Sequence, residues 1–122
     1  MPHPFTVTRS AEGDVSVLAL DGYLDAHTAP AFEEAIQAEL DAGRVRLVVD
    51  GGQLKYISSA GLGVFMGFIE EVRERGGDIK ICGLAPRVRQ VFDILGFPAI
   101  YDVMESREAA IRRFAGPPAA GV

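Results

Sequence analysis

Apolar and polar positions alternate in some parts of the chain and recur every three to four residues in others, which predicts an ordered mixture of strands and helices. Two short runs at 5–8 and 15–20 are rich in β-branched residues and flank a turn-forming sequence at 12–14, so they predict a hairpin. Apolar side chains then recur at helical spacing over 28–40. The chain is therefore expected to begin with two antiparallel strands and a helix.

The middle of the chain continues with strands and helices in alternation. A strand is predicted over 44–49, and its run 47–49 is apolar on both faces, as is typical of a central strand that helices cover on both sides. A helix is predicted over 60–75 and a strand over 78–82, and a further helix begins at Pro86 and stops at Gly96. The apolar face predicted for the helix 60–75 comprises Leu62, Phe65, Met66, Phe68, Ile69 and Val72.

The last part of the chain is predicted to add a strand, a helix and a tail. A short edge strand is expected around 99–101, and Ser106 is placed to cap a final helix. The segment 115–122 has almost no bulky apolar side chain and is predicted to be disordered. This order of elements predicts one α/β domain with a mostly parallel sheet of four to five strands, an N-terminal hairpin and about four helices.

Functional groups in such sheets gather at the carboxyl ends of the parallel strands, which here brings the loops 21–26, 50–59 and 83–85 to one edge. The sequence Ser-Ser-Ala-Gly-Leu-Gly at 58–63 lies at this edge, where a strand is followed by a helix. The first amides of a helix have no partner within the helix and its dipole is positive there, so a phosphate on a serine would be stabilised. We therefore expect a phosphorylation switch at this point.

Other residues near the serines have a functional and an ordinary interpretation. Asp25 and Asp50 are expected to flank the serines and to oppose a phosphate, or else to be common turn and strand-end acids. Gly63 and Gly67 lie four residues apart, next to Val64 and opposite the apolar face of their helix. They make either a smooth strip that a partner's backbone could approach or a close contact with a neighbouring loop or strand.

Composition and the apolar pattern disfavour some classes of binding partner and some cellular compartments. The 122 residues include 12 Lys and Arg against 17 Asp and Glu, and the net charge of −5 disfavours nucleic acids and anionic membranes as partners. No apolar run approaches the ~18 residues that a membrane span requires, and the amino terminus lacks a signal-peptide pattern. The cytoplasm is therefore the expected compartment.

Neither catalysis nor metal binding is indicated. His3 and His27 are far apart in the sequence, and no acidic or cysteine residues accompany them as further metal ligands. We therefore expect both to be solvent-exposed and predict no metal site. The lone Cys82 is expected to be a small buried apolar group. The chain has no Gly-x-Ser-x-Gly elbow and no Gly-rich phosphate loop, which disfavours an enzyme with serine nucleophiles and any cofactor.

The motif at the sheet edge resembles that of the anti-sigma factor antagonist family, the single-domain members of the STAS fold. The resemblance covers about 5–114 and is carried by the segments 56–64, 22–25 and 91–97. It implies a protein without catalytic activity whose function is to bind another protein. In that family the unphosphorylated antagonist binds an anti-sigma factor that is also a serine kinase, which frees the sigma factor. Phosphorylation of the antagonist breaks the complex, and a serine phosphatase restores it.

The chain departs from the family motif at the acceptor position. That motif reads Asp-Ser-Ser-Gly-Leu, with the phosphate on the second serine, and alignment on Gly61 places Ser58 at the Asp and Ala60 at that serine. Two alternatives remain: the phosphate goes to Ser59, with Ser58 as second choice, or the module acts without phosphorylation. In the second case it would be a scaffold or a subunit of a signalling or transport assembly. Ser59 is favoured because it adjoins the expected position and is predicted to be the N-cap.

The predicted partner-binding residues are Asp25, Asp50, Ser58, Ser59, Ala60, Gly61, Gly63, Val64 and Gly67. The resemblance leaves open which sigma factor, kinase and signal are involved. The sequence also leaves open whether the module dimerises.

Overall fold

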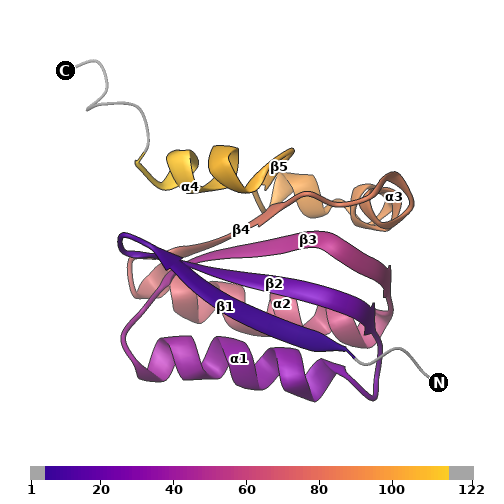
Figure 1. Ribbon diagram of the computed structural model, residues 1–122, viewed down its shortest axis with the longest axis horizontal. Helices are drawn as coiled ribbons and strands as arrows, with labels where there is room; N and C mark the ends of the chain where they lie inside the picture. The colour runs from indigo at the N-terminus through magenta and orange to yellow at the C-terminus, as the bar shows by residue number, and fades with distance from the viewer. Residues whose placement is uncertain (1–4, 116–122) are drawn as a thin grey trace.

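The computed structural model describes residues 5–115, which form a five-stranded mixed sheet with helices on both of its sides (Figure 1). The strand order is β1-β2-β3-β4-β5; β1 and β2 are antiparallel and all other neighbours are parallel. The predicted α/β class and N-terminal hairpin are thus confirmed. The tail predicted to be disordered lies outside the described residues, except for Ala115, and so does His3.

The first three elements follow the predicted order. Strands β1 (Thr6–Glu12) and β2 (Val15–Leu24) pair from Thr6↔Asp21 to Glu12↔Val15. Gly13 has a φ of +61°, which a tight hairpin turn requires and which glycine adopts without strain. Helix α1 (Ala29–Asp41) follows and has a proline in its first turn.

The central strand is much longer than its apolar run predicts. Strand β3 (Arg46–Ile57) includes most of the segment that we expected to be the loop 50–59. Beyond Asp50 it keeps pairing with β2 as far as Leu24↔Ile57, and the register shifts twice on the way. The Gly51-Gly52 pair, which suggests a loop in the sequence, lies at the first irregularity of the strand instead.

The second half of the chain contains the remaining elements. Helix α2 (Ser59–Glu74) and strand β4 (Asp78–Cys82) lie where the sequence predicts them. Helix α3 (Pro86–Ile94) ends before Gly96, which has a φ of +75°. A 3₁₀ turn, η1 (Phe97–Ala99), precedes strand β5 (Val103–Met104) and helix α4 (Arg107–Ala115).

The edge strand predicted around 99–101 is therefore wrong in position. That segment turns through η1, and Tyr101 is buried with its ring stacked on Phe97 at a centroid distance of 5.1 Å. The predicted cap of the last helix is confirmed, because the Ser106 hydroxyl oxygen accepts a hydrogen bond from the Ala109 amide (3.1 Å).

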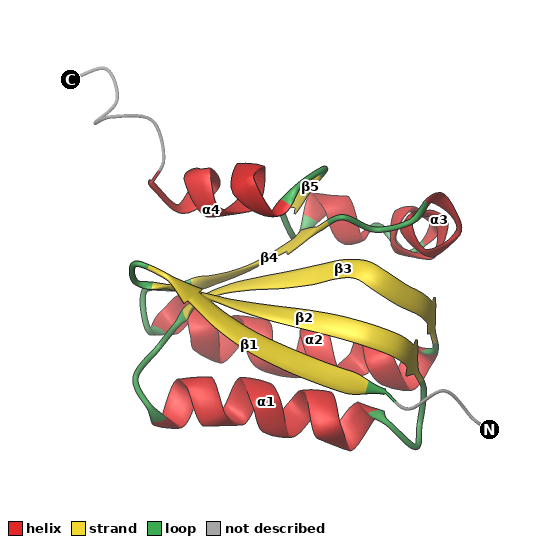
Figure 2. Cartoon of the chain, viewed as in Figure 1, coloured by secondary structure: helices red, strands yellow, loops and turns green. Residues whose placement is uncertain are grey.

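The helices form two layers. Figure 1 shows α1 and α2 below the sheet and α3 and α4 above it, and Figure 2 shows the same arrangement by secondary structure. Strand β4 pairs with β3 only as far as Asp50↔Cys82, so the last part of β3 has no neighbour on that side. Past the end of β4, Phe65 of α2 meets Phe92 of α3 edge to face at 5.8 Å. The aromatic core thus joins the two helix layers.

Two details of the buried core bear on the sequence predictions. Met66, assigned to the apolar face of α2, is 47% exposed, although the other five residues of that predicted face are buried. Cys82 is fully buried against the α4 side, as predicted. Burial, with a contribution from Asp50, raises the pKa of the Cys82 thiol to about 12, so the thiol stays protonated at neutral pH.

Candidate functional site

The end of β2 and the start of α2 lie together at the carboxyl edge of the sheet. The Ser58 amide donates a hydrogen bond to the Leu24 carbonyl (2.9 Å), which ties the β3–α2 junction to the turn that precedes α1. Figure 1 shows the amino ends of α1 and α2 at this same edge. The structure therefore brings Asp25, Ser58 and Ser59 together, as the sequence predicts.

The two serines have different structural roles. Ser58 is the N-cap of α2: its backbone is extended, its Oγ accepts from the Gly61 amide (3.4 Å), and its carbonyl accepts from Leu62 (3.0 Å). The prediction that Ser59 is the N-cap is wrong by one residue. Ser59 is the first helical residue and is exposed, and its hydroxyl makes no hydrogen bond with any residue of 5–115. The hydroxyl of Ser58 is thus engaged in the fold, whereas that of Ser59 is available.

Asp25 organises the turn between β2 and α1. Its Oδ1 accepts hydrogen bonds from the amides of His27 (2.9 Å) and Thr28 (3.2 Å). Partial desolvation opposes ionisation, but these backbone hydrogen bonds outweigh it and lower the pKa of Asp25 below its usual value. The carboxylate is therefore charged at neutral pH and lies at the edge that carries Ser59, in the ordinary geometry of a turn acid. His27 beside it is exposed, as predicted.

The placement of Asp50 at this edge is wrong. Asp50 lies within β3, seven residues before Ile57, and each residue of a strand advances about 3.3 Å. Side chains of a strand alternate between its faces, and Asp50 projects to the side of α4, where its Oδ2 pairs with Arg107 Nη2 (2.8 Å). The misplacement follows from the extension of β3 through the expected loop.

The three glycines of α2 differ in their surroundings. A Cβ atom on Gly61 would lie 2.7 Å from Leu24 Cγ, so this glycine is required for packing between α2 and the end of β2. A Cβ on Gly63 or Gly67 would meet no atom within 4 Å. Close packing against a neighbouring segment therefore does not explain Gly63 and Gly67, which are exposed on the surface of the helix.

A surface groove runs between α1 and α2. It has a volume of about 470 Å³, and Ala60, Gly63 and Gly67 contribute its α2 side. Val64 also borders it, but it is only 8% exposed and belongs to the apolar core between the two helices. The apolar face predicted for α2 therefore lacked a residue, because it did not include Val64. From α1 the groove receives Glu33 and Gln37, which the sequence analysis did not single out.

Two exposed tyrosines near the serines were missed in the sequence. Tyr23 and Tyr56 are 50% and 48% exposed, pair across β2 and β3, and have ring centroids 6.0 Å apart. Their alternation with the buried Leu24 and Ile57 is the signal that could have identified them. Half-exposed tyrosines are common at protein interfaces, because the ring offers apolar area and the hydroxyl stays in water.

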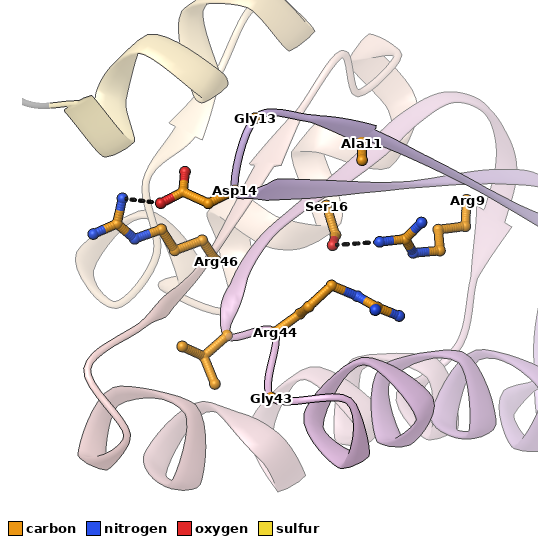
Figure 3. Close-up of a pocket in the computed structure, with 9 residues that line it drawn as sticks. Arg9, Ala11, Gly13, Asp14, Ser16, Gly43, Arg44 and Arg46 are labelled. Atoms are coloured by element: carbon orange, nitrogen blue, oxygen red, sulfur yellow. Dashed lines mark hydrogen bonds and ion pairs between the residues drawn. The ribbon is translucent and has the colours of Figure 1, made fainter.

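The opposite end of the sheet holds a different pocket. Figure 3 shows Arg9 of β1 and Arg44 of the connection between α1 and β3 pointing into it, with Arg9 bonded to Ser16. Both guanidinium groups also bind the carboxylate of Glu39, which is 2% exposed, at 2.7 Å. Burial opposes its ionisation, but hydrogen bonds from Arg44, Ser16 and Arg9 outweigh burial and lower the pKa of Glu39 to about 2. The charges of Arg9 and Arg44 at this pocket are therefore paired within the protein itself.

Neither a cluster of metal ligands nor a membrane-spanning helix is present within residues 5–115. No group of three or more His, Cys, Asp or Glu side chains is arranged there to hold a metal ion. None of the helices in that range is long and apolar enough to cross a membrane. The carboxyl edge with Ser59 and the adjoining groove remains the candidate functional site.

Known proteins resemble this chain in sequence and in fold. The family model described as the STAS domain matches residues 7–110. The candidate anti-sigma factor antagonist BtrV of Bordetella bronchiseptica is 41% identical over 98 residues, which cover 80% of this chain and 84% of BtrV. The anti-sigma-B factor antagonist of Bacillus subtilis is 30% identical over 102 residues, which cover 83% of this chain and 91% of that protein.

Solved structures agree with this assignment of the fold. The unphosphorylated anti-sigma factor antagonist SpoIIAA superposes with a TM-score of 0.77 and 23% identity over 93% of this chain and 98% of its own. The phosphorylated form of the Bacillus SpoIIAA superposes with a TM-score of 0.69 and 22% identity over 91% of this chain and 99% of its own. The chain thus belongs to the STAS domain family and, within it, to the anti-sigma factor antagonists, which are regulatory proteins without enzymatic activity.

Proposed function

We propose that this protein binds an anti-sigma factor that is also a serine kinase, and that phosphorylation of Ser59 breaks the complex. The observation that carries the proposal is the contrast between the two serines. The Ser58 hydroxyl is engaged as the cap of α2, whereas Ser59 is exposed and bonded to no other described residue. A kinase can reach Ser59 without breaking a hydrogen bond of the fold.

The position of Ser59 also supports tolerance of the phosphate by the domain itself. A phosphoserine carries about −1.5 to −2 charges at neutral pH, and the amino end of a helix stabilises such charge. The ionised Asp25 at the same edge opposes it, so the modified state is only moderately stabilised. We expect the phosphorylated protein to remain folded, as the phosphorylated SpoIIAA structure illustrates for a protein of the same fold.

The effect on the partner is expected to be large. A surface that fits the neutral hydroxyl of Ser59 would meet a bulky dianion after phosphorylation. Mismatched charge across an interface costs several kcal/mol, and about 1.4 kcal/mol weakens binding tenfold. Contacts beside Ser59 are proposed at Asp25, Ala60, Gly63 and Gly67, together with Tyr23 and Tyr56. A serine phosphatase would reverse the modification, and the cytoplasm is the proposed compartment.

The test combines phosphorylation with binding. The protein is incubated with ATP and the anti-sigma factor kinase encoded by the same genome, and the modified residue is identified by mass spectrometry. We expect phosphate on Ser59 in the wild type and in Ser58→Ala, and none in Ser59→Ala. Calorimetry should show that Ser59→Ala binds like the wild type and that Ser59→Asp binds at least 30-fold more weakly.

One observation favours a second candidate function. Ala60 stands where the resembling family motif has its phosphate acceptor, which is compatible with a module that binds its partner without being modified. In that case neither serine receives phosphate, and Ser59→Asp leaves binding unchanged. Stable purification with subunits of a signalling or transport assembly, unaffected by ATP, would then identify the protein as a scaffold.

A further inference from the structure

The two helix layers carry opposite charge. The exposed acidic side chains of α1 and α2 outnumber the basic ones by six to one, the single base being Arg73. In α3 and α4 the ratio is reversed, with five arginines against two acids. The acids of the first layer are Glu33, Glu34, Asp41, Glu70, Glu71 and Glu74. The net charge of the chain is therefore concentrated on one side of the sheet.

The acidic layer contains the groove next to Ser59. On α2, the positions Ser59, Gly63, Gly67, Glu70 and Glu74 follow helical spacing and are all exposed, so they share one outward face. This face begins with the Ser59 hydroxyl, which bonds to no residue of 5–115, continues over two residues without side chains, and ends with two carboxylates. Glu33 lines the groove from the α1 side, whereas Glu70 and Glu74 lie beside the groove and line a separate hollow.

The surroundings of the groove differ between its two ends. Beyond the groove, towards the carboxyl ends of both helices, Arg75 Nη2 donates to the Leu40 carbonyl (2.9 Å) and joins α2 to the end of α1. At the other end, Ala26 and Ala60 line the groove next to the exposed Ser59. A segment seated in the groove would therefore pass close to Ser59 as it leaves.

We propose that the groove between α1 and α2 is the docking site for a basic segment of the anti-sigma factor, an inference that rests on the proposed function. Gly63 and Gly67 allow the segment's backbone to approach the helix closely. Glu33 inside the groove pairs with its Lys or Arg side chains, and Glu70 and Glu74 on the adjoining outward face of α2 add to the attraction. Complementary charge of this kind also accelerates association at low salt.

Phosphate on Ser59 would displace this segment because the phosphate group is bulky. It adds negative charge to a face that is already acidic, so long-range attraction of a basic segment is not lost. Release must come from obstruction where the segment passes Ser59. The phosphorylated protein should accordingly bind more weakly and still respond to salt, which separates the two contributions.

The test uses charge reversal in the groove with a matched control. Glu33→Lys combined with Glu70→Lys reverses one carboxylate of the groove and one on the adjoining face of α2, neither of which makes a hydrogen bond or ion pair with another residue of 5–115. The control combines Glu12→Lys, at the hairpin on the opposite end, with Glu105→Lys, before α4, and changes the net charge equally. The probe is the anti-sigma factor kinase of the same genome, with affinity measured by calorimetry at 50 and 300 mM salt.

We expect the groove variant to bind at least tenfold more weakly at 50 mM salt and to lose most of the salt dependence, while the control stays within threefold of the wild type. A second arm tests the shape of the groove. Gly67→Leu places a side chain in the open space and should weaken binding at least tenfold. Ala38→Leu changes an exposed residue of α1 that does not line the groove and should leave binding unchanged. Circular dichroism and thermal melting confirm that each variant is folded.

The outcomes separate this inference from the proposed function. If the wild type binds the kinase and Ser59→Asp weakens binding, but neither groove variant has an effect, the groove inference is overturned and the proposed function stands. If charge reversal and its control weaken binding equally, the effect reflects net charge, and the groove inference is again overturned. If the wild type binds no anti-sigma factor of the genome, both fail.

Discussion

The two ends of the sheet differ in whether their polar side chains are hydrogen-bonded within the protein. At one end, the buried Glu39 carboxylate accepts hydrogen bonds from Arg9 and Arg44, and each donor lies 2.7 Å away. At the other end, Ser59 is exposed and has no hydrogen bond with any described residue, and Tyr23 and Tyr56 leave half of their surface open. At the first end the protein itself provides the hydrogen-bond partners, whereas at the second end the exposed side chains can contact another molecule.

This difference separates residues that the fold needs from residues that a partner needs. A buried carboxylate without its hydrogen bonds would be strongly destabilising, so Glu39 must have its arginines. An exposed serine on the surface of a helix contributes little to stability and can be modified freely. Substitutions at the Glu39 end should therefore affect mainly folding, and substitutions at Ser59 should affect mainly binding. Four measurements test this difference.

Replacing Glu39 should have the largest effect on folding. Glu39→Ala removes the two charge-assisted hydrogen bonds of 2.7 Å from Arg9 and Arg44, whose side chains are 40% and 41% exposed, and we expect the free energy of unfolding to fall by about 3 kcal/mol, or about 1.5 kcal/mol per hydrogen bond. Ser59→Ala should change it by less than about 0.5 kcal/mol. Urea denaturation at pH 7 measures both variants, and equal effects would abolish the contrast between the two ends.

Acid should weaken the end that holds Glu39. The folded state lowers the pKa of Glu39 from 4.5 to about 2, so the carboxylate stabilises the fold above pH 4.5, and this contribution is lost as the pH falls towards 2. Glu39→Gln lacks the contribution. Its stability deficit relative to the wild type should shrink from about 2 kcal/mol at pH 6 to almost none at pH 2. A deficit that does not depend on pH would mean that Glu39 acts through packing alone.

Gly61→Ala should show that part of the carboxyl edge is structural. The added methyl group would overlap Leu24, and we expect a loss of about 2 kcal/mol from crowding. Gly63→Ala meets no atom and should stabilise α2 by up to about 1 kcal/mol, because alanine favours helix more than glycine does. Thermal unfolding of the two variants should shift in opposite directions; a shift in the same direction would contradict the assigned roles.

The smallest expected difference distinguishes the two serines. Ser58→Ala removes the cap of α2 and should cost about 1 kcal/mol. Ser59→Ala removes a hydroxyl that bonds to no residue of 5–115 and should leave the melting temperature within about a degree. If Ser59→Ala is the more destabilising variant, then Ser59 is the cap in solution.

The sequence predicted the fold well because periodicity and turn residues are local properties. Strand β4 and the starts of α2 and α3 agree with the apolar pattern to within one residue. The length of β3 was missed because Gly51 and Gly52 are typical of loops, and only the pairing with β2 shows that the strand continues through them. That single error also placed Asp50 at the wrong edge.

The candidate site was predicted less completely, because it depends on contacts between elements. A shift of one residue at the start of α2 exchanged the roles of Ser58 and Ser59. The groove forms only because α1 lies beside α2, so the sequence alone does not indicate that Glu33 and Gln37 line it. Whether a glycine packs closely or stays open likewise depends on its neighbours, which is why Gly61 differs from Gly63 and Gly67.

The aromatic cluster around Phe65 also provides a spectroscopic reporter. The chain contains no tryptophan, so intrinsic fluorescence is weak, but Phe65 has four aromatic rings at centroid distances of 5.1 to 6.3 Å. Ring currents from these neighbours displace its proton resonances strongly and vary with small changes of ring orientation. Because Phe65 belongs to the helix that begins at Ser59, its NMR signals would register a shift of α2 on complex formation without any attached label.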